Sequence, residues 1–438
     1  CASALLMSTT EAMSRDVASV PLLWVAPLAV FLLTVIVAFD RPRLYRRAPT
    51  VGLMLAGVLA VSLVWLFGDT VPLGSSAGAH LLVLGAGCTL CHGELYRGRP
   101  DAMDLTGYHL WMALGGAVGG LGVAIAAPAV FERMVELPVT LVLVVVVFAL
   151  GARREPSGRR VATFAVLGLL LVGVVVGGAG LSKLQRAVAH DQTVLWRSRS
   201  AHGALTLVER QVDGVTRRLL VDGNTTHGMQ HLDGPDAGSP TLYFTSETGV
   251  GQAFAEVRGR ADRVNVGLIG LGAGTLAAYG RSGDRFTFYE INPDVVWAAR
   301  QHFTFLSGSA AAVSVHIGDG RMLLATAPPA APLDLLVVDA FSSDAIPTHL
   351  LTREAMTLYR SRLRPAGLVA FHVTNRNLDL VGVVEALAAD AHLGARVVRT
   401  EGVATWVLVG QGLPAPAHAG ASHPWTDDHA PLWQALRP

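Results

Sequence analysis

Glycines and acidic residues recur at the ends of apolar runs in the second half of the chain, where they could bind a ligand. The stretch GLIGLGAGT places Gly270, Gly272 and Gly274 between a strand-like run and a short helical run. Glycines at such a turn let the backbone approach a ligand closely, and a helix N-terminus favours polar or anionic groups. Glycines also serve plain strand-to-helix turns, so these three indicate a site only together with other residues.

Three acids follow the next strand-like runs. Glu290 ends FTFYE, 20 residues after Gly270, where an acid commonly holds ribose hydroxyls. Asp319, next to Gly320, lies in IGDGR after VSVHI, and Asp339 ends LDLLVVD. Asp319 could instead cap a helix, and Asp339 could be a turn residue. Together with the glycines, these acids favour a ligand that carries ribose hydroxyls.

A parallel sheet is needed to bring these residues together. The strand-like runs VNVGLIG, FTFYEI, VSVHIG, LDLLVVDA and GLVAFHV alternate with helical patterns. This alternation predicts a doubly wound parallel sheet with helices on both faces. RVVRT and TWVLVG then predict a closing antiparallel pair. Ligands of such sheets bind outside the carboxyl ends of the strands, so the glycines and the three acids are expected at one edge.

The first part of the chain has a membrane-like composition. The whole chain is 51% hydrophobic and only 15% charged, against about 25% charged residues in soluble domains. Each of six apolar runs approaches the ~20 residues that cross a bilayer core. The predicted spans are Val20–Phe39, Thr50–Phe67, Ala77–Cys91, Tyr108–Val130, Val135–Gly151 and Val161–Leu181.

A short β-rich region lies between these two parts. LTLVER, RRLLVDG and PTLYF read as strands, the first two joined by a turn at Asp213-Gly214. We therefore predict a transmembrane helical domain over 1–185, a β-rich region over 186–260 and a Rossmann-like domain over 261–438.

The motifs of the second half resemble those of the spermidine synthases, the aminopropyltransferase branch of the class I methyltransferase-like fold. GLIGLGAGT, YEINPDVV, GDGR and DLLVVDAFSSDAIP carry the resemblance, which covers about residues 195–438. The membrane half, together with PWTDDHAPL near the end, resembles bacterial proteins that fuse a transporter-like region to a spermidine synthase domain. The resemblance implies a multi-pass protein of the bacterial inner membrane.

On the donor side, the resemblance implies an S-adenosylmethionine-type substrate. Glu290 would bind its ribose hydroxyls and Asp319 its adenine amino group. The remaining implied donor-binding residues are a glutamine and four glycines: Gln230, Gly270, Gly272, Gly274 and Gly320.

On the catalytic side, the resemblance implies that Asp339 takes a proton from the attacking amine. Tyr243 would lie over the pocket, and Asp344 would lie in a gate loop. The carbons next to a sulfonium are electrophilic, but a protonated amine has no lone pair with which to attack. A carboxylate that holds the ammonium and accepts its proton supplies both positioning and base catalysis.

The chain also departs from the family pattern. Ala273 stands where the family has an aspartate for the donor ammonium, and in YFTSETGVG only Glu247 is left of the acceptor-binding residues. His227 and Asp427–Asp428 could replace these contacts. Alternatively, the histidine is structural and the aspartate pair caps a helix that starts at Ala430.

Three functions therefore remain open. The first is aminopropyl transfer from a decarboxylated donor to a polyamine. The second is a lyase reaction that converts S-adenosylmethionine into methylthioadenosine and homoserine lactone. The third is a non-catalytic nucleoside sensor or gate for the membrane half. We expect no metal and no permanently bound cofactor, no nucleic-acid partner at a net charge of +1, and a homo-oligomer.

The stretch CTLCH, Cys88–His92, has the spacing of a haem-c attachment site. Three loops that would share this side of the membrane hold ten arginines, and the opposite loops hold Arg133 alone. The positive-inside rule then places CTLCH at the cytoplasmic end of its span, where haem c is not attached. His92 and Glu94 are instead expected to form a polar site at the membrane edge.

The arginine count would also place the second half outside the cytoplasm, because three predicted spans follow CTLCH. Either one apolar run does not cross, with Val135–Gly151 the first candidate, or the membrane half delivers the substrate, or the positive-inside rule does not hold here. Because S-adenosylmethionine is cytosolic, we expect a cytoplasmic catalytic domain. Since the chain starts at Cys1, CASALLMSTTEAM is expected to be the tail of a lost apolar segment, or Cys1 to be lipidated.

Overall fold

The computed structural model describes residues 1–15, 21–67, 71–132, 134–152, 159–169, 173, 192–200, 202–222, 225–327, 329–340, 347–375, 378–417 and 423–437. The chain forms two compact units, Cys1–Ala189 and His190–Pro438, which are described one by one below. The domain limit predicted at residue 185 falls outside the described residues.

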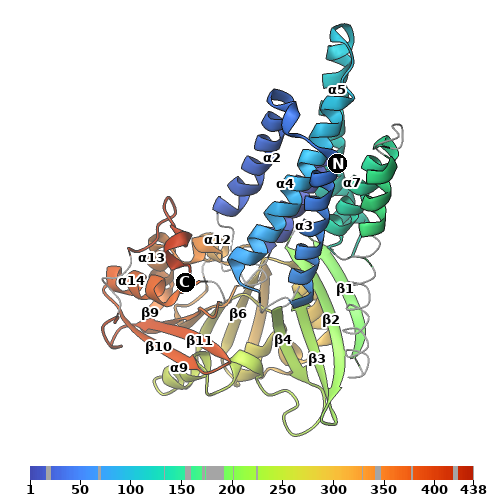
Figure 1. Ribbon diagram of the computed structural model, residues 1–438. Helices are drawn as coiled ribbons and strands as arrows, with labels where there is room; N and C mark the ends of the chain where they lie inside the picture. The colour runs from blue at the N-terminus through green and yellow to red at the C-terminus, as the bar shows by residue number, and fades with distance from the viewer. Residues whose placement is uncertain are drawn as a thin grey trace. The chain divides into compact units, whose positions relative to one another are not determined.

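The first unit is a bundle of helices (Figure 1). Its helices are α1 (Ala2–Arg15), α2 (Pro21–Asp40), α3 (Arg47–Phe67), α4 (Leu73–Arg97), α5 (Leu105–Leu121), a π-helical turn (Gly122–Ala126), α6 (Ala127–Val130), α7 (Glu136–Ala152) and a run over 159–169. Helix α4 packs against α1, α2, α3 and α7. The approach is close because Gly57 of α3 lies on the backbone of Val83, and Gly87 of α4 lies on Leu5 of α1.

Three helices of this unit are long and apolar enough to cross a membrane: Arg47–Phe67, Leu73–Arg97 and Leu105–Val130. They coincide with the second, third and fourth predicted spans. Trp24–Asp40 and Glu136–Ala152 are shorter apolar helices, and the sixth predicted span extends beyond the described residues. Helix α1 was not predicted. It forms because its Leu5 and Thr9 are fully buried in the bundle.

The second unit begins with a small antiparallel sheet. Its order is β1 (Gln192–Ser200), β2 (Gly203–Val212), β3 (Val215–Asp222) and β4 (Thr225–His231). The predicted turn at Asp213-Gly214 is confirmed, with φ values of 54° and 76°. The strand predicted at PTLYF is wrong, because Leu242–Phe244 is a 3-10 turn in which Leu242 has a φ of 56°.

The larger sheet has seven strands in the order β10-β11-β9-β8-β5-β6-β7. The strands are β5 (Asn265–Ile269), β6 (Arg285–Glu290), β7 (Ala312–Ile317), β8 (Leu333–Val338), β9 (Leu363–His372), β10 (Gly394–Thr400) and β11 (Ala404–Gly410). Strands β5 to β9 are parallel, and β11 runs antiparallel to both of its neighbours. The predicted parallel sheet, its closing antiparallel pair and the Rossmann-like methyltransferase fold are thus confirmed for this unit.

Helices cover both faces of this sheet (Figure 1). They are α9 (Gly249–Arg258), α10 (Pro293–His302), α11 (Phe305–Gly308), α12 (Gly320–Thr326), α13 (Arg353–Arg362) and α14 (Val381–Asp390), with 3-10 turns η6 (Thr275–Tyr279), η7 (Thr348–Leu350) and η8 (Leu432–Ala435). Phe254 of α9 and Val296 of α10 pack with Val266 and Leu335 on one face, and Gly320 of α12 lies on Ile269 on the other. Every residue of β5 and β8 is buried, the polar Asn265 and Asp334 included, as expected for strands covered on both faces.

Candidate active site

The glycine turn after β5 fits closely against two other strands. Gly270 has a φ of 99°, and a side chain there would meet the Asp339 carbonyl after β8. Gly272 has a φ of 54°, and a side chain there would meet the His227 carbonyl on β4. Both positions therefore require glycine. The turn brings β5, β8 and the small sheet together around one space.

That space is a cavity of about 200 Å³ at the carboxyl ends of β5, β6 and β8. Eight of the predicted site residues line it: His227, Tyr243, Gly270, Gly272, Glu290, Asp319, Gly320 and Asp339. The sheet thus collects residues from strands far apart in sequence, as expected for ligand sites of this architecture.

Glu290 is held by backbone amides at the end of β6. Its Oε2 accepts from Leu271 N at 3.0 Å and its Oε1 from Asn292 N at 2.8 Å. Burial raises the pKa of this carboxyl above its ordinary value. The backbone hydrogen bonds oppose that rise, and the charge of Asp339 adds to it. Glu290 lines the cavity, and its orientation is fixed by one amide of the glycine turn and one amide of the segment after β6.

Asp319 caps α12 and also faces the cavity. Its Oδ1 accepts from Met322 N at 2.8 Å, and its Oδ2 lies 2.8 Å from Nε2 of His349. The capping and ligand-binding interpretations of the sequence are therefore compatible, because the two oxygens serve different neighbours.

Asp339 lies where β8 ends, and His372 lies where β9 ends. Oδ1 of Asp339 is 2.6 Å from Nδ1 of His372, and the side chains are 12% and 5% exposed. Its second oxygen, Oδ2, has no hydrogen-bond partner among the residues that the structure describes. Asp339 is thus a carboxylate with one oxygen anchored and one available to a ligand.

Tyr243 and His227 complete the same end of the cavity. Burial, and secondarily the charge of Asp339, raises the pKa of Tyr243 well above its ordinary value, and its hydroxyl donates to Thr226 O at 3.1 Å. Burial lowers the pKa of His227, although Asp222 and Asp339 oppose the shift. His227 is therefore neutral at pH 7, and its buried Nε2 has no partner within the described part of the chain.

Three of the predicted residues that the structure describes, Gln230, Gly274 and Glu247, do not line the cavity. Gln230 is buried, and its side-chain amide makes two hydrogen bonds to Thr304. It donates to Oγ1 at 2.5 Å and accepts from the backbone N at 3.0 Å. Gly274 begins η6 and packs on Leu306, and Glu247 is exposed before α9. Asp344 lies outside the described residues.

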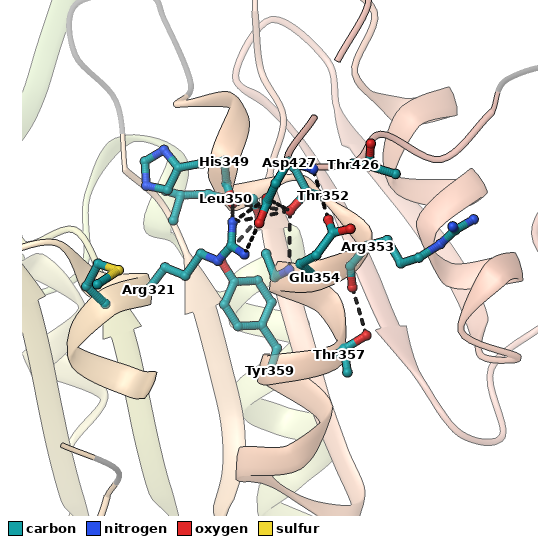
Figure 2. Close-up of polar contacts among 12 residues, drawn as sticks. Arg321, His349, Leu350, Thr352, Arg353, Glu354, Thr357, Tyr359, Thr426 and Asp427 are labelled. Carbon is teal, nitrogen blue, oxygen red and sulfur yellow. Dashed lines mark hydrogen bonds and ion pairs between the residues drawn. The ribbon is translucent and has the colours of Figure 1, made fainter. Parts of the chain in front are cut away.

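Asp427 belongs to a polar cluster beside the cavity (Figure 2). Its carboxylate accepts two hydrogen bonds of 2.6 Å from Arg321 of α12 and one of 2.8 Å from Thr352. Arg321 also donates to His349 O at 2.8 Å. The cluster therefore ties the C-terminal segment to η7, which carries His349. Asp428 is exposed, and neither aspartate caps η8, whose N-cap is Pro431.

His92 and Glu94 both lie on α4 in the first unit, with separate partners. Nδ1 of His92 is 3.0 Å from Oγ1 of Thr34. Glu94 accepts from Arg47 through two bonds of 2.7 Å and from Tyr45 at 2.6 Å. Arg47 and Glu94 line a cavity of about 530 Å³. In the described part of the chain, no three His, Cys, Asp or Glu side chains form a group that could hold a metal ion.

Sequence reasoning missed three lining or neighbouring residues: Asp222, His349 and His372. Asp222 ends β3 and is 5% exposed, and His372 ends β9. The rule that found Glu290 and Asp339, a polar residue directly after an apolar strand, applies to both. The runs GLVAFH and RRLLVD therefore carry the sequence signal that identifies His372 and Asp222.

The cavity is strongly acidic. Asp222, Glu290, Asp319 and Asp339 line it together with three histidines, and its described lining contains no lysine or arginine. Four carboxylates in about 200 Å³ favour a cationic ligand, since an anion would meet like charges with no basic partner.

Comparison with known proteins gives matches among solved structures only. No family model and no curated protein matches the chain. A probable spermidine synthase from Corynebacterium glutamicum is 16% identical, with a TM-score of 0.41, over 55% of this chain and 98% of that one. A spermidine synthase from Thermotoga maritima is 13% identical, with a TM-score of 0.38, over 56% and 84%. Human methyltransferase-like protein 13, in complex with SAH, is 24% identical, with a TM-score of 0.31, over 37% and 78%. By its own strand order, the second unit of this chain is a Rossmann-like domain of the methyltransferase type.

Proposed function

We propose that the chain is an aminopropyltransferase-like enzyme that uses decarboxylated S-adenosylmethionine and releases methylthioadenosine. The observation that carries this proposal is the acidic cavity, in which a glycine turn, Glu290, Asp319 and Asp339 meet at the carboxyl edge of the sheet. A sulfonium nucleoside with a terminal ammonium is dicationic, and the described lining matches it with carboxylates.

We infer a single orientation of the donor from the residues that line the cavity. Glu290 can accept from the ribose hydroxyls with the lone pairs that the backbone amides leave, and Asp319 can accept from the adenine amino group. The adenosyl group then lies along Gly270 and Gly272. This orientation directs the sulfonium towards Asp339, Tyr243 and His227.

The reaction follows from the free oxygen of Asp339. The acceptor ammonium gives one proton to Oδ2, and its freed lone pair forms a bond to the carbon next to the sulfur. The carbon–sulfur bond breaks, and its electron pair stays on the sulfur of methylthioadenosine. A positioned carboxylate base of this kind contributes about 10²–10⁴-fold to the rate.

The lyase reaction is a second candidate, favoured by Ala273. This residue is 1% exposed and its methyl group packs on Gly228, so the family's acid for the donor ammonium has no counterpart there. In that reaction the carboxylate of S-adenosylmethionine attacks its own γ-carbon, which gives methylthioadenosine and homoserine lactone without an acceptor. The acidic lining weighs against it, because the substrate carboxylate would meet Asp222 and Asp339.

The test is to incubate the detergent-solubilised full chain with S-adenosylmethionine or its decarboxylated form, each with and without putrescine. Methylthioadenosine is measured by chromatography. Release only from the decarboxylated donor plus putrescine supports aminopropyl transfer. Release from S-adenosylmethionine without amine supports the lyase. Binding without any turnover supports a non-catalytic sensor and contradicts both enzyme proposals. Asp339→Asn is the catalytic control and is expected to bind methylthioadenosine as the wild type does.

We further propose that the enzyme is a multi-pass protein of the bacterial inner membrane with the second unit on the cytoplasmic side. The three membrane-length helices and the cytosolic origin of the donor support this placement. Whether the enzyme is a homo-oligomer stays a prediction.

A further inference from the structure

His372 is held on four sides at the end of β9. Its Nδ1 lies 2.6 Å from Oδ1 of Asp339, and its Nε2 lies 2.8 Å from Oγ1 of Thr374. Its ring stacks on Tyr243, with centroids 4.7 Å apart, and on Trp406, with centroids 4.5 Å apart. A ring sandwiched in this way has no freedom to turn, so the direction of its two nitrogens is fixed by packing.

The hydrogen bonds of His372, Thr374 and Thr405 indicate which nitrogen of the His372 ring carries the proton. Thr374 Oγ1 accepts from Thr405 N at 2.8 Å, so its own proton is available for donation. The two possible acceptors are Nε2 of His372 at 2.8 Å and Thr405 O at 3.5 Å. The shorter contact is the better hydrogen bond. Nε2 is then the acceptor, and the proton of the neutral ring lies on Nδ1, from which it is donated to Asp339.

This arrangement decides what Asp339 can do. A ring that donates from Nδ1 requires Oδ1 of Asp339 to be the acceptor, which leaves Oδ2 as the oxygen that can take a proton. This contact also fixes the rotation of the carboxyl group of Asp339, which lines the cavity. The logic is that of a catalytic triad with its direction changed: the histidine orients the carboxylate, and the carboxylate acts on the substrate.

We propose that His372, oriented by Thr374 and by the rings of Tyr243 and Trp406, is a positioning residue for Asp339. The inference rests on the proposed function and adds to it the device that holds the base. His372 itself does not touch the substrate, because it is 6% exposed and does not line the cavity.

The titratable groups that the structure describes around the pair include residues of the cavity. Tyr243 stacks on the ring, Asp339 faces Nδ1, and the charge of Asp339 also acts on His227 and Glu290. Changes at His372 are therefore expected to act on catalysis through Asp339, and only weakly on the distant adenine end.

The kinetic test uses the full chain in detergent with variants His372→Ala, His372→Asn and Thr374→Val. We expect His372→Ala to lower kcat by about 10²-fold, the lower end of the range for a positioned base, with less than twofold change in methylthioadenosine affinity by calorimetry. His372→Asn keeps a donor near Oδ1 and should restore part of the loss. The double variant Asp339→Asn/His372→Ala should be no slower than Asp339→Asn alone, because the two act as one unit.

Equal losses in affinity and kcat, or additive losses in the double variant, would overturn the proposal. His392→Asn, an exposed turn histidine, is the matched control.

A second measurement does not depend on turnover. Nitrogen chemical shifts of ¹⁵N-histidine-labelled full chain, assigned by the loss of signals in His372→Asn, report which ring nitrogen carries the proton. We expect the Nδ1-protonated neutral tautomer in wild type and its loss in Thr374→Val. A proton on Nε2 contradicts the inference whatever the activity. If the expected tautomer is found but no donor releases methylthioadenosine, the proposed function fails while the tautomer assignment stands.

Discussion

Single residues in this site carry structural and chemical roles at the same time. Glu290 accepts one backbone hydrogen bond from the glycine turn and one from Asn292, and Asp319 caps a helix. Each carboxylate has about four lone-pair sites, so a ligand can share it with the backbone. A variant at such a residue therefore has to be judged by ligand binding and by stability together.

At this scale we predict an unusual pH dependence for nucleoside affinity. Because burial raises the pKa of Glu290, its carboxylate gains a proton at a higher pH than an exposed glutamate does as the pH falls. The charged form of Glu290 is the better acceptor for ribose hydroxyls. As the pH falls, this form is therefore lost at a higher pH than for an exposed glutamate. Methylthioadenosine affinity should decline as the pH falls through this raised value. Calorimetry across pH checks this, and Glu290→Gln should bind more weakly, by about 1 kcal/mol per lost hydrogen bond, without that pH step.

Also at this scale, Ala273→Asp should not restore the family's ammonium contact. The Ala273 methyl group is buried against the Gly228 backbone, so a carboxylate added there is desolvated beside the acidic cavity. We expect destabilisation of about 1–3 kcal/mol and no gain in turnover. Thermal unfolding and methylthioadenosine release are the measurements. A more active variant of unchanged stability would show that the cavity tolerates a fifth acid. Ala273→Asn is the size-matched neutral control.

At the scale of elements, the C-terminal segment takes part in the architecture of the site. Arg321 of α12 binds both Asp427 of that segment and the carbonyl of His349 on η7 (Figure 2). His349 in turn contacts Asp319 at the adenine end. Helix α12, turn η7 and the C-terminal segment are therefore linked by the Arg321 guanidinium together with the Asp319–His349 and Thr352–Asp427 contacts.

We predict that Asp427→Asn weakens nucleoside affinity by about two- to fivefold, since less than 1 kcal/mol is expected from a half-exposed ion pair. The hydrogen bonds from Arg321 lower the pKa of Asp427, with burial opposing. A lowered pKa means that the stabilisation is present above the ordinary aspartate value and is lost as the pH falls through the lowered one. Asp428→Asn, at the exposed neighbouring residue, should change nothing. If Asp427→Asn and Asp428→Asn bind the nucleoside with the same affinity, the C-terminal segment does not contribute to nucleoside binding.

At the scale of the whole molecule, a unit with membrane-length helices and a Rossmann-like unit share one chain. The arginine count in the predicted loops and the cytosolic source of the donor point to opposite sides for the second unit. The shorter helix Glu136–Ala152, with 17 residues, is the element whose crossing decides between them.

We predict that the second unit is cytoplasmic. A fluorescent protein fused after Pro438 should fluoresce, and alkaline phosphatase at the same point should be inactive in cells. The reverse pattern would place the catalytic unit outside and require the donor to cross the membrane. Carbonate washing, which removes peripheral proteins, should leave the full chain in the membrane pellet.

Much of the second unit could be predicted from the sequence, because its central strands β5 and β8 are buried on both faces and their sequences are mostly apolar. The carboxyl ends of such strands meet at one edge, so Glu290, Asp319 and Asp339 could be assigned to one site before any coordinate was known. The membrane-length helices were likewise determined by their apolar composition.

Other features depend on contacts between distant segments, which local patterns do not encode. The strands β1 and β4 exist because they pair with β2 and β3, and Gln230 is directed to Thr304 instead of the cavity by the packing of β4. The partnership of Asp339 with His372 joins the ends of two adjacent parallel strands. The sequence by itself determined which residue types reach the sheet edge. Only the tertiary structure decided which of them share a cavity and how their protons are arranged, because hydrogen-bond geometry is set by side chains that meet across the sheet.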